Sequence, residues 1–153
     1  MGQVHTTSHV DVAPEQAFEF GAQAERMPEW NASIVEVKDV GGPLDTAGAG
    51  YTAVMKLGGR KLEGHWAVTR VEKPLFAELR GTAPGGGTAT WITRYAPAAG
   101  GTDITIELDY ELPGGFIGGL ADKLFVERAI ERDLRHSSEN FKAIVEAEAP
   151  VHA

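Results

Sequence analysis

The sequence predicts an α+β fold, in which an antiparallel sheet of seven strands wraps around one long C-terminal helix and two short helices follow the first strand. Glycine pairs separate strand-like runs, one run alternates cleanly between apolar and polar residues, and no Gly or Pro occurs between Leu120 and Ala149. At 153 residues the chain is long enough for one domain with its own core. We expect that domain to span residues 1–148 and residues 149–153 to form a tail.

Seven runs have strand character, and glycine pairs or a triplet separate several of them, as hairpin turns do. In the last run Ile104, Ile106 and Leu108 share one face, and Glu107 and Asp109 share the other. A strand with one apolar and one polar face is typical of an antiparallel sheet. The predicted strands span residues 3–12, 33–40, 51–57, 60–71, 75–82, 88–95 and 102–112.

A short helical stretch lies between the first two predicted strands. Pro14 suits the first position of a helix, and Glu15 complements the positive end of its dipole. The segment Met27–Trp30 then turns the chain into the second strand, because the ring of Pro28 blocks continuation of a preceding helix.

The final helix is predicted from Leu120 to about Glu148, which at ~1.5 Å per residue gives a length of roughly 45 Å. Such a helix needs a large apolar surface to lie against, and laid across a curved sheet it encloses a space. We expect the functional site in that space.

Two neighbouring faces of this helix could turn toward the sheet. One is interrupted in its middle by Glu127, Arg128 and Glu131. The other, slightly further round, offers Phe125, Ala129 and Ile130, and the pattern favours it. The interrupted face consists of Ile117, Leu120, Leu124, Leu134, Phe141 and Val145.

The charge balance restricts the possible partners. The formal net charge is −8, from 22 acidic and 14 basic residues, which argues against nucleic acid or an anionic membrane as a partner. No apolar run approaches the ~20 residues that span a bilayer, and the N-terminus lacks a signal-peptide pattern. The sequence therefore predicts a cytoplasmic protein without membrane insertion, and leaves open whether it is a monomer or a homodimer.

No metal site or cofactor is predicted. The chain has no cysteine, which excludes disulfides and thiolate ligands. His5 and His9 lie four residues apart on a predicted strand, so roughly 13 Å would separate them. The segment Gly85–Thr88 lacks the lysine of a phosphate-binding loop, and no dinucleotide motif opens a helix.

Four motifs in order resemble one known family. The first three are Val10–Phe18 with its Ala-Pro pair, Met27-Pro28-Glu29-Trp30, and Leu112-Pro113-Gly114-Gly115-Phe116-Ile117-Gly118 before the final helix. The fourth lies on that helix, where Arg132-Asp133-Leu134 and Phe141-Lys142-Ala143 match the phase of the family's helix. Together they resemble the SRPBCC superfamily, with its START/Bet v 1-like helix-grip fold, and within it the polyketide cyclase/dehydrase-like group. The resemblance covers residues 3–147. It implies an internal cavity for an apolar or aromatic small molecule, in a superfamily that includes aromatic polyketide cyclases and carriers of lipids and quinones.

The candidate cavity residues are mainly aromatic, since aromatic walls suit flat hydrophobic ligands. The three tryptophans come from three segments that folding could bring together, although all three could equally be plain core. On the long helix, Asp133, Ser137 and Asn140 are candidates for polar contacts. The predicted ligand-binding residues are Trp30, Tyr51, Met55, Trp66, Trp91 and Tyr110.

Arg70 is the candidate catalytic residue. Strict alternation along residues 60–71 places it on the face of Trp66, where an arginine is costly unless it is paired or faces a wet cavity. There it could polarise a ligand carbonyl. Aromatase/cyclases of the family that this chain resembles have such an inward arginine after an inward tryptophan. The alternative is an arginine that reaches solvent at the open end of the strand.

Three functions remain open at this point. The first is binding of a lipid, quinone or polyketide-like metabolite, which needs only the cavity. The second is a cofactor-free aromatase/cyclase, in which Arg70 stabilises an enolate. His65 is predicted to face away, so no base is evident, and this favours binding. The third, a protein-interaction module, requires an exposed apolar patch that a sequence cannot reveal.

Overall fold

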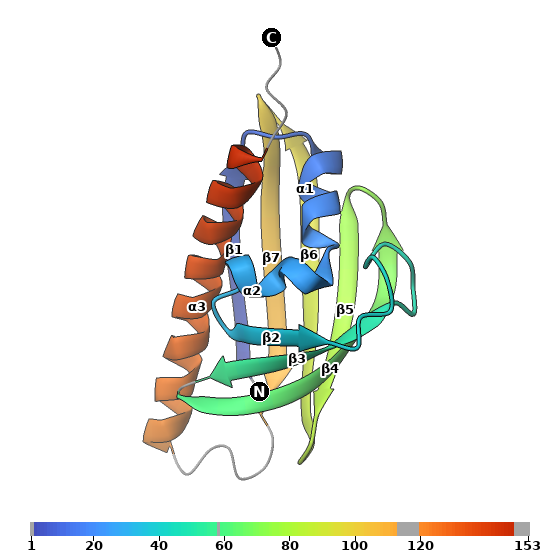
Figure 1. Cartoon of the computed structure of the whole chain (residues 1–153). Helices are drawn as coiled ribbons and strands as arrows, with labels where there is room; N and C mark the ends of the chain where they lie inside the picture. The colour runs from blue at the N-terminus through green and yellow to red at the C-terminus, as the bar shows by residue number, and fades with distance from the viewer. Residues whose placement is uncertain (1, 58, 113–119, 149–153) are drawn as a thin grey trace.

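Seven strands form one antiparallel sheet in the order β1-β7-β6-β5-β4-β3-β2 in the computed structural model, which describes residues 2–57, 59–112 and 120–148 (Figure 1). The predicted number of strands and their antiparallel pairing are confirmed. The predicted tail at 149–153 lies outside the described residues. The strands are β1 (Gly2–Val10), β2 (Ile34–Lys38), β3 (Gly50–Leu57), β4 (Arg60–Glu72), β5 (Phe76–Ala83), β6 (Gly87–Ala98) and β7 (Gly101–Glu111).

The sheet curves strongly, because β2, β3 and the lower part of β4 run across the direction of β6 and β7 (Figure 1). Strands β1 and β2 are its two edges. The chain crosses from one edge to the other through α1 (Pro14–Gly21), a 3₁₀ turn η1 (Ala24–Arg26) and α2 (Met27–Trp30). Two short helices after the first strand are thereby confirmed. Pro28 stands in the first turn of α2, where its missing N–H costs nothing.

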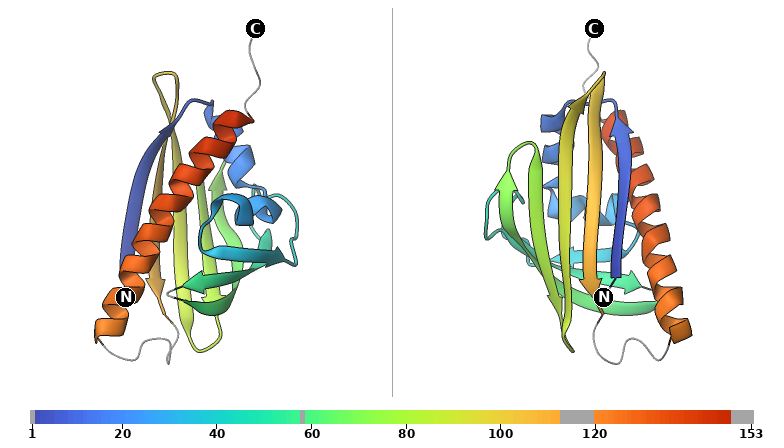
Figure 2. Two further views of the ribbon diagram at one scale, coloured as in Figure 1. Left: turned by 60° about the vertical axis from the view of Figure 1, so that its left-hand side comes forward. Right: turned by 180° about the vertical axis from the view of Figure 1, so that it is seen from behind.

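The long helix α3 (Leu120–Ala147) lies along the concave side of the sheet, beside β1 (Figure 2). Hydrogen bonds join its last turns to residues in the N-terminal third of the chain. Lys142 Nζ donates to the carbonyl of His9 at 2.7 Å, and the backbone N–H of Asp11 donates to Glu146 at 2.7 Å. Arg26 hydrogen-bonds the Glu148 carboxyl and so holds its pKa below the usual value.

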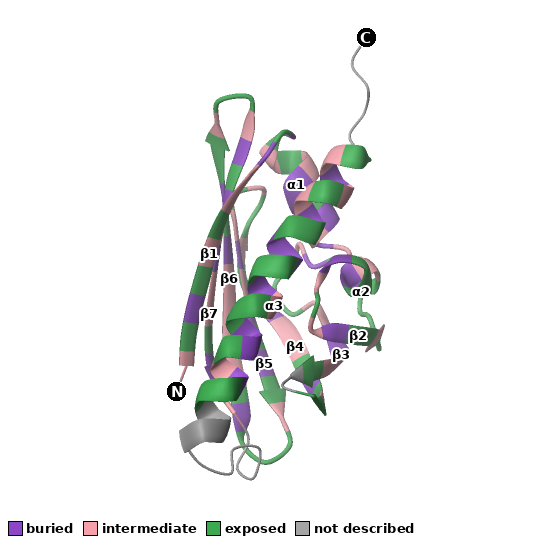
Figure 3. Cartoon of the chain, turned by 90° about the vertical axis from the view of Figure 1, so that its left-hand side faces the viewer, coloured by how far each residue is buried: buried purple, intermediate pink, exposed green. Residues whose placement is uncertain are grey.

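One stripe of α3 is buried against the sheet (Figure 3). The prediction that the inner face includes Ala129 and Ile130 is confirmed, but the prediction for Phe125 is wrong, since this residue is 62% exposed. Phe125 points about 100° away from Val126, which takes the inner position instead. Leu124 is 47% exposed, and the side chains of residues 117 and 120 lie outside the described part. The buried stripe consists of Val126, Ala129, Ile130, Leu134, Ser137, Ser138, Phe141 and Val145.

Phe141 joins the helix to the short helices through aromatic contacts. Its ring meets Phe20 and Trp30 edge to face, with centroids 5.0 and 5.2 Å apart. Edge-to-face pairs of this kind add to the stabilisation that comes from burying their area.

We expect Phe141→Ala to lower the free energy of unfolding by about 3–5 kcal/mol, because it removes both ring contacts and leaves a cavity. Phe125→Ala is the matched control on the same helix and should change stability by no more than about 0.5 kcal/mol. Urea denaturation followed by circular dichroism measures both. Equal losses in the two variants would contradict the assignment of the inner face.

Candidate functional site

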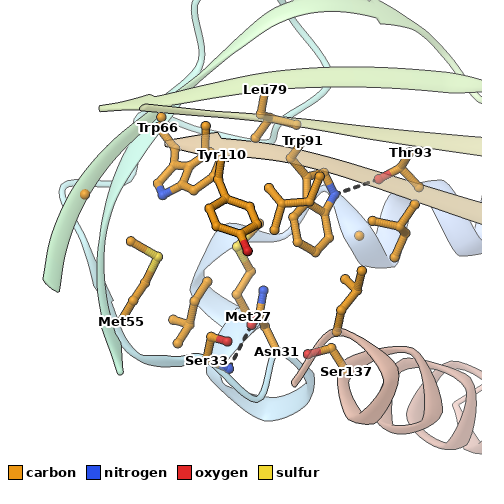
Figure 4. A pocket seen from close by; sticks show the side chains of 18 of the residues that line it. Met27, Asn31, Ser33, Met55, Trp66, Leu79, Trp91, Thr93, Tyr110 and Ser137 are labelled. Atoms are coloured by element: carbon orange, nitrogen blue, oxygen red, sulfur yellow. Dashed lines mark hydrogen bonds between the residues drawn. The ribbon is translucent and has the colours of Figure 1, made fainter. Parts of the chain in front are cut away.

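A cavity of about 150 Å³ lies between the inner face of the sheet and α3, with α1 and α2 at its side (Figure 4). Its wall comes from all seven strands of the sheet and from α1, α2 and α3. The residues that the sequence predicted for the cavity are brought together in this wall, and each contributes atoms to it. They are Trp30, Tyr51, Met55, Trp66, Trp91 and Tyr110.

Glycines make room for Trp66. Trp66 on β4 pairs with Gly81 on β5, and a Cβ at Gly81 would come within 2.7 Å of the indole ring. A Cβ at Gly64 would lie 2.9 Å from the methyl group of Met55 and 3.3 Å from the indole nitrogen. Sequence reasoning missed both positions, although glycine inside a strand often marks a close approach of this kind. The ring therefore lies flat against the sheet and forms part of the wall.

Trp91 is held by a neighbour on its own strand. Its indole N–H donates to Thr93 Oγ1 at 2.8 Å (Figure 4). The two residues are two positions apart on β6 and therefore share the inner face. This bond fixes the orientation of the ring and satisfies its one donor.

Four buried side-chain atoms have no hydrogen-bond partner within the described protein, and all four belong to residues of the cavity wall. They are Trp30 Nε1, Trp66 Nε1, Tyr110 Oη and Ser138 Oγ. Leaving a buried polar group unpaired costs about 1–3 kcal/mol, and native proteins satisfy most such groups. All four atoms are buried behind the surface of the wall, so the surface that the cavity presents is mainly apolar.

The tyrosine hydroxyls of the wall remain protonated at neutral pH. Burial raises the pKa of Tyr110 to about 12, and the charges of Glu127 and Glu131 on α3 contribute in the same direction. Burial also raises the pKa of Tyr51 and of Tyr95. These phenols therefore cannot accept a proton at neutral pH.

A polar network beneath the cavity ties the start of β2 to α3. Asn31 Oδ1 accepts from the backbone N–H of Ser33 at 3.0 Å, which leaves the amide nitrogen of Asn31 directed at the cavity (Figure 4). Ser33 Oγ donates to Asp133 at 3.1 Å, and Ser137 Oγ accepts from the backbone of Ala32 at 2.8 Å. Asp133 and Ser137 were expected to make polar contacts, whereas Asn31 and Ser33 were missed.

The prediction that Arg70 faces the cavity is wrong. A β-bulge lies between Val68, which pairs with Leu79, and Arg70, which pairs with Glu78. The extra residue, Thr69, reverses the alternation, so side chains beyond the bulge change faces. Arg70 is 64% exposed and pairs with Glu72 at 2.9 Å on the outer surface. The structure instead has the alternative arrangement, in which the side chain of Arg70 reaches solvent.

The described part of the wall contains one charged residue, Glu111, which is exposed at the end of β7. It contains no Arg, Lys or His among those residues. His65 faces away from the cavity and contacts Thr52 Oγ1 at 2.9 Å. In the same described ranges no three His, Asp or Glu side chains gather as metal ligands would, and none of the helices there could cross a membrane.

Comparison with protein families agrees with the cavity and the fold. The model of a family described as polyketide cyclase/dehydrase and lipid transport matches residues 1–146. The chain belongs to this family. The resemblance that its motifs indicated is therefore confirmed, and the sheet around α3 is the helix-grip fold that the resemblance implied. No curated protein matches the chain.

Solved structures share the fold of this family member at low sequence identity. TTHA0849 from Thermus thermophilus gives a TM-score of 0.80 at 18% identity, covering 97% of this chain and 100% of that one. A START superfamily protein from Mycobacterium smegmatis gives 0.72 at 16%, with 96% and 99% covered. DynU16, a putative protein of the dynemicin biosynthetic locus, gives 0.66 at 15%, with 97% of this chain but 48% of that one covered.

We expect Gly81→Ala to displace the Trp66 ring, because the new methyl group would overlap it. Overpacking of this kind costs about 1–3 kcal/mol and should also change the near-ultraviolet circular dichroism of the tryptophans. Gly41→Ala is the control, since a Cβ there meets only backbone atoms at 3.6 Å or more. An unchanged spectrum in Gly81→Ala would contradict the position of the Trp66 ring against Gly81.

Proposed function

We propose that this protein binds an apolar or aromatic small molecule in the cavity between the sheet and α3, and that it carries or holds the molecule without transforming it. The observation that supports this most is the composition of the wall, in which aromatic and aliphatic side chains surround a few uncharged polar groups. Small-molecule sites commonly combine these features. The membership of the family adds support, since its description includes lipid transport.

The ligand-binding residues of this proposal are those that the sequence predicted. Trp66, Trp91 and Tyr110 present rings to the cavity (Figure 4). Aromatic side chains bury a large area of a flat ligand at little cost in conformational freedom. Trp30, Tyr51 and Met55 complete the set, and Met55 adds a flexible thioether that adapts to ligand shape.

A cofactor-free polyketide cyclase is the alternative, and the described wall supports it less well. Cyclisation requires a group that removes a proton and a group that stabilises the resulting enolate. Burial raises the pKa values of Tyr51, Tyr95 and Tyr110, so these phenols stay protonated at neutral pH and cannot accept a proton, and Glu111 is exposed to water. Arg70, the cation expected for this role, lies on the outer surface.

We also propose that the protein acts in the cytoplasm, as a monomer or homodimer of one domain spanning residues 1–148. The net charge of −8 supports the absence of a nucleic-acid partner.

A variant that fills the cavity tests the proposal. Ala89 lines the cavity from β6, so Ala89→Phe should weaken binding of an apolar naphthalene probe roughly tenfold or more, by occupying the same space. Ala96→Phe introduces the same ring at an exposed position of the same strand and should bind like the unmodified protein, as should Arg70→Ala. Calorimetry measures affinity, and native mass spectrometry detects any ligand that co-purifies.

Equal affinity of Ala89→Phe and Ala96→Phe would place binding outside the cavity. Loss of binding in Arg70→Ala would point to the outer face of β4 instead.

A further inference from the structure

We infer that the outer side of the first half of α3 docks an acidic protein partner that presents an apolar side chain. Two exposed apolar residues and three exposed arginines lie together there, in a chain whose net charge is −8 (Figure 3). None of these residues lines the cavity, so the surface is separate from the site proposed for the small molecule. We call it the cationic face of α3, and it consists of Leu124, Phe125, Arg128, Arg132 and Arg135.

The apolar part of the cationic face is an adjacent pair of residues. Phe125 is 62% exposed and Leu124 is 47% exposed, and each lies one turn before Arg128 on the helix surface. Phe125 is the most exposed of the large apolar residues that the structure describes. A single exposed apolar side chain is ordinary, but protein interfaces are enriched in aromatic residues and in arginine. The cationic face therefore has the composition of a protein interface.

The arginines form one row along the helix. Arg128, Arg132 and Arg135 stand at positions i, i+4 and i+7, which places them on one side of α3 on successive turns. Within the described residues Arg128 and Arg135 make no ion pair or hydrogen bond, and Arg132 approaches Asp133 only at 3.7 Å. By contrast, Arg94 hydrogen-bonds a glutamate of the sheet at 2.9 Å. The guanidinium groups of the row are thus available to carboxylates of another molecule, which arginine binds in a bidentate manner.

The glutamates near the row do not neutralise it. Glu127 and Glu131 both contribute to the raised pKa of Tyr110, so they lie toward the sheet side of α3. Glu139 stands one turn beyond Arg135, where the cationic face ends. Within the part of the chain that the structure describes, none of these three glutamates pairs with an arginine of the face.

The charge of the whole chain decides which kind of partner fits. Because the net charge is −8, the part of the molecule outside the cationic face is more acidic than the chain as a whole. A membrane or a nucleic acid presents a wide anionic surface, which meets that acidic remainder as well as the arginines. A short acidic segment of a protein touches the cationic face alone, since salt screens charges that lie more than about 8–10 Å away.

A second copy of this chain fits the face less well. In a two-fold dimer the same patch meets itself, so two rows of arginines would oppose each other. The occupant that matches both parts of the face is an acidic protein segment, with carboxylates against the arginines and an apolar side chain over Phe125.

Two synthetic peptides test the inference. Each is a helix with blocked ends and one leucine. One carries glutamates at positions i, i+4 and i+7, and its twin carries glutamines there. Titration of the isotope-labelled full chain, followed by nuclear magnetic resonance, gives both the affinity and the residues contacted. We expect the acidic peptide to shift signals centred on residues 124–135 and to bind roughly fivefold tighter than its twin, or more.

Variants of the cationic face identify the contacts. Phe125→Ala should weaken the acidic peptide roughly fivefold or more, because an aromatic anchor is lost. Arg128→Gln combined with Arg135→Gln should weaken it roughly tenfold and reduce its preference over the twin. Lys56→Gln combined with Lys61→Gln is the matched control, since it removes two exposed cations from β3 and β4 and should leave the affinity unchanged. All of these variants should bind the naphthalene probe like the unmodified protein, because none of the residues lines the cavity.

Several outcomes would overturn the inference. They are equal affinity of the two peptides, no detectable binding of the acidic peptide, contacts centred elsewhere on the chain, or an equal loss in the arginine and lysine variants. Flotation with phosphatidylglycerol vesicles that is lost in the double arginine variant would make the face a lipid-binding surface instead. A dimer that sedimentation detects in the unmodified protein but not in Phe125→Ala would show that a second copy covers the face.

Discussion

The interior of this protein depends on the fit between one helix and a sheet that is wider than the helix. An α-helix with its side chains is about 10–12 Å across, and α3 is the one long helix on the concave side of seven strands, where the short helices α1 and α2 cover a further part (Figure 2). Its buried stripe includes three small residues, Ala129, Ser137 and Ser138. Ser137 and Ser138 line the cavity, because at these small residues the side chains of α3 and of the sheet do not fill the space between helix and sheet. The cavity is therefore a consequence of the architecture and needs no missing element to explain it.

The same architecture decides which polar groups find partners. Along a strand, residues two apart share a face, so Thr93 is within reach of Trp91. Trp66 has Gly64 two positions before it and Gly81 across from it, and neither has a side chain that could accept a hydrogen bond. The glycines that make room for the ring thus also leave its N–H unpartnered. Buried polar groups without a hydrogen-bond partner are a local departure that is expected at functional sites.

Much of the fold and of the wall could be predicted from the sequence, because both depend on periodicity. Alternation placed Trp66 and Tyr110 inside, and the absence of Gly and Pro gave the extent of α3. The wrong predictions come from features that the periodicity of the sequence does not show. One extra residue, Thr69, moved Arg70 to the outer surface. The apolar pattern of α3 favoured Phe125 on the inner face, where the structure has Val126. Unpartnered atoms depend on side-chain contacts across the fold, so no local pattern reveals them.

Carrying a ligand and transforming it place different demands on this wall. Cyclisation requires a group that stabilises an enolate and a group that removes a proton. Arg70, the cation expected for the first role, lies on the outer surface. Tyr110, with a pKa of about 12, cannot accept a proton at neutral pH, and His65 turns away from the cavity toward Thr52. The described wall therefore supports the proposed role of a carrier better than it supports cyclisation.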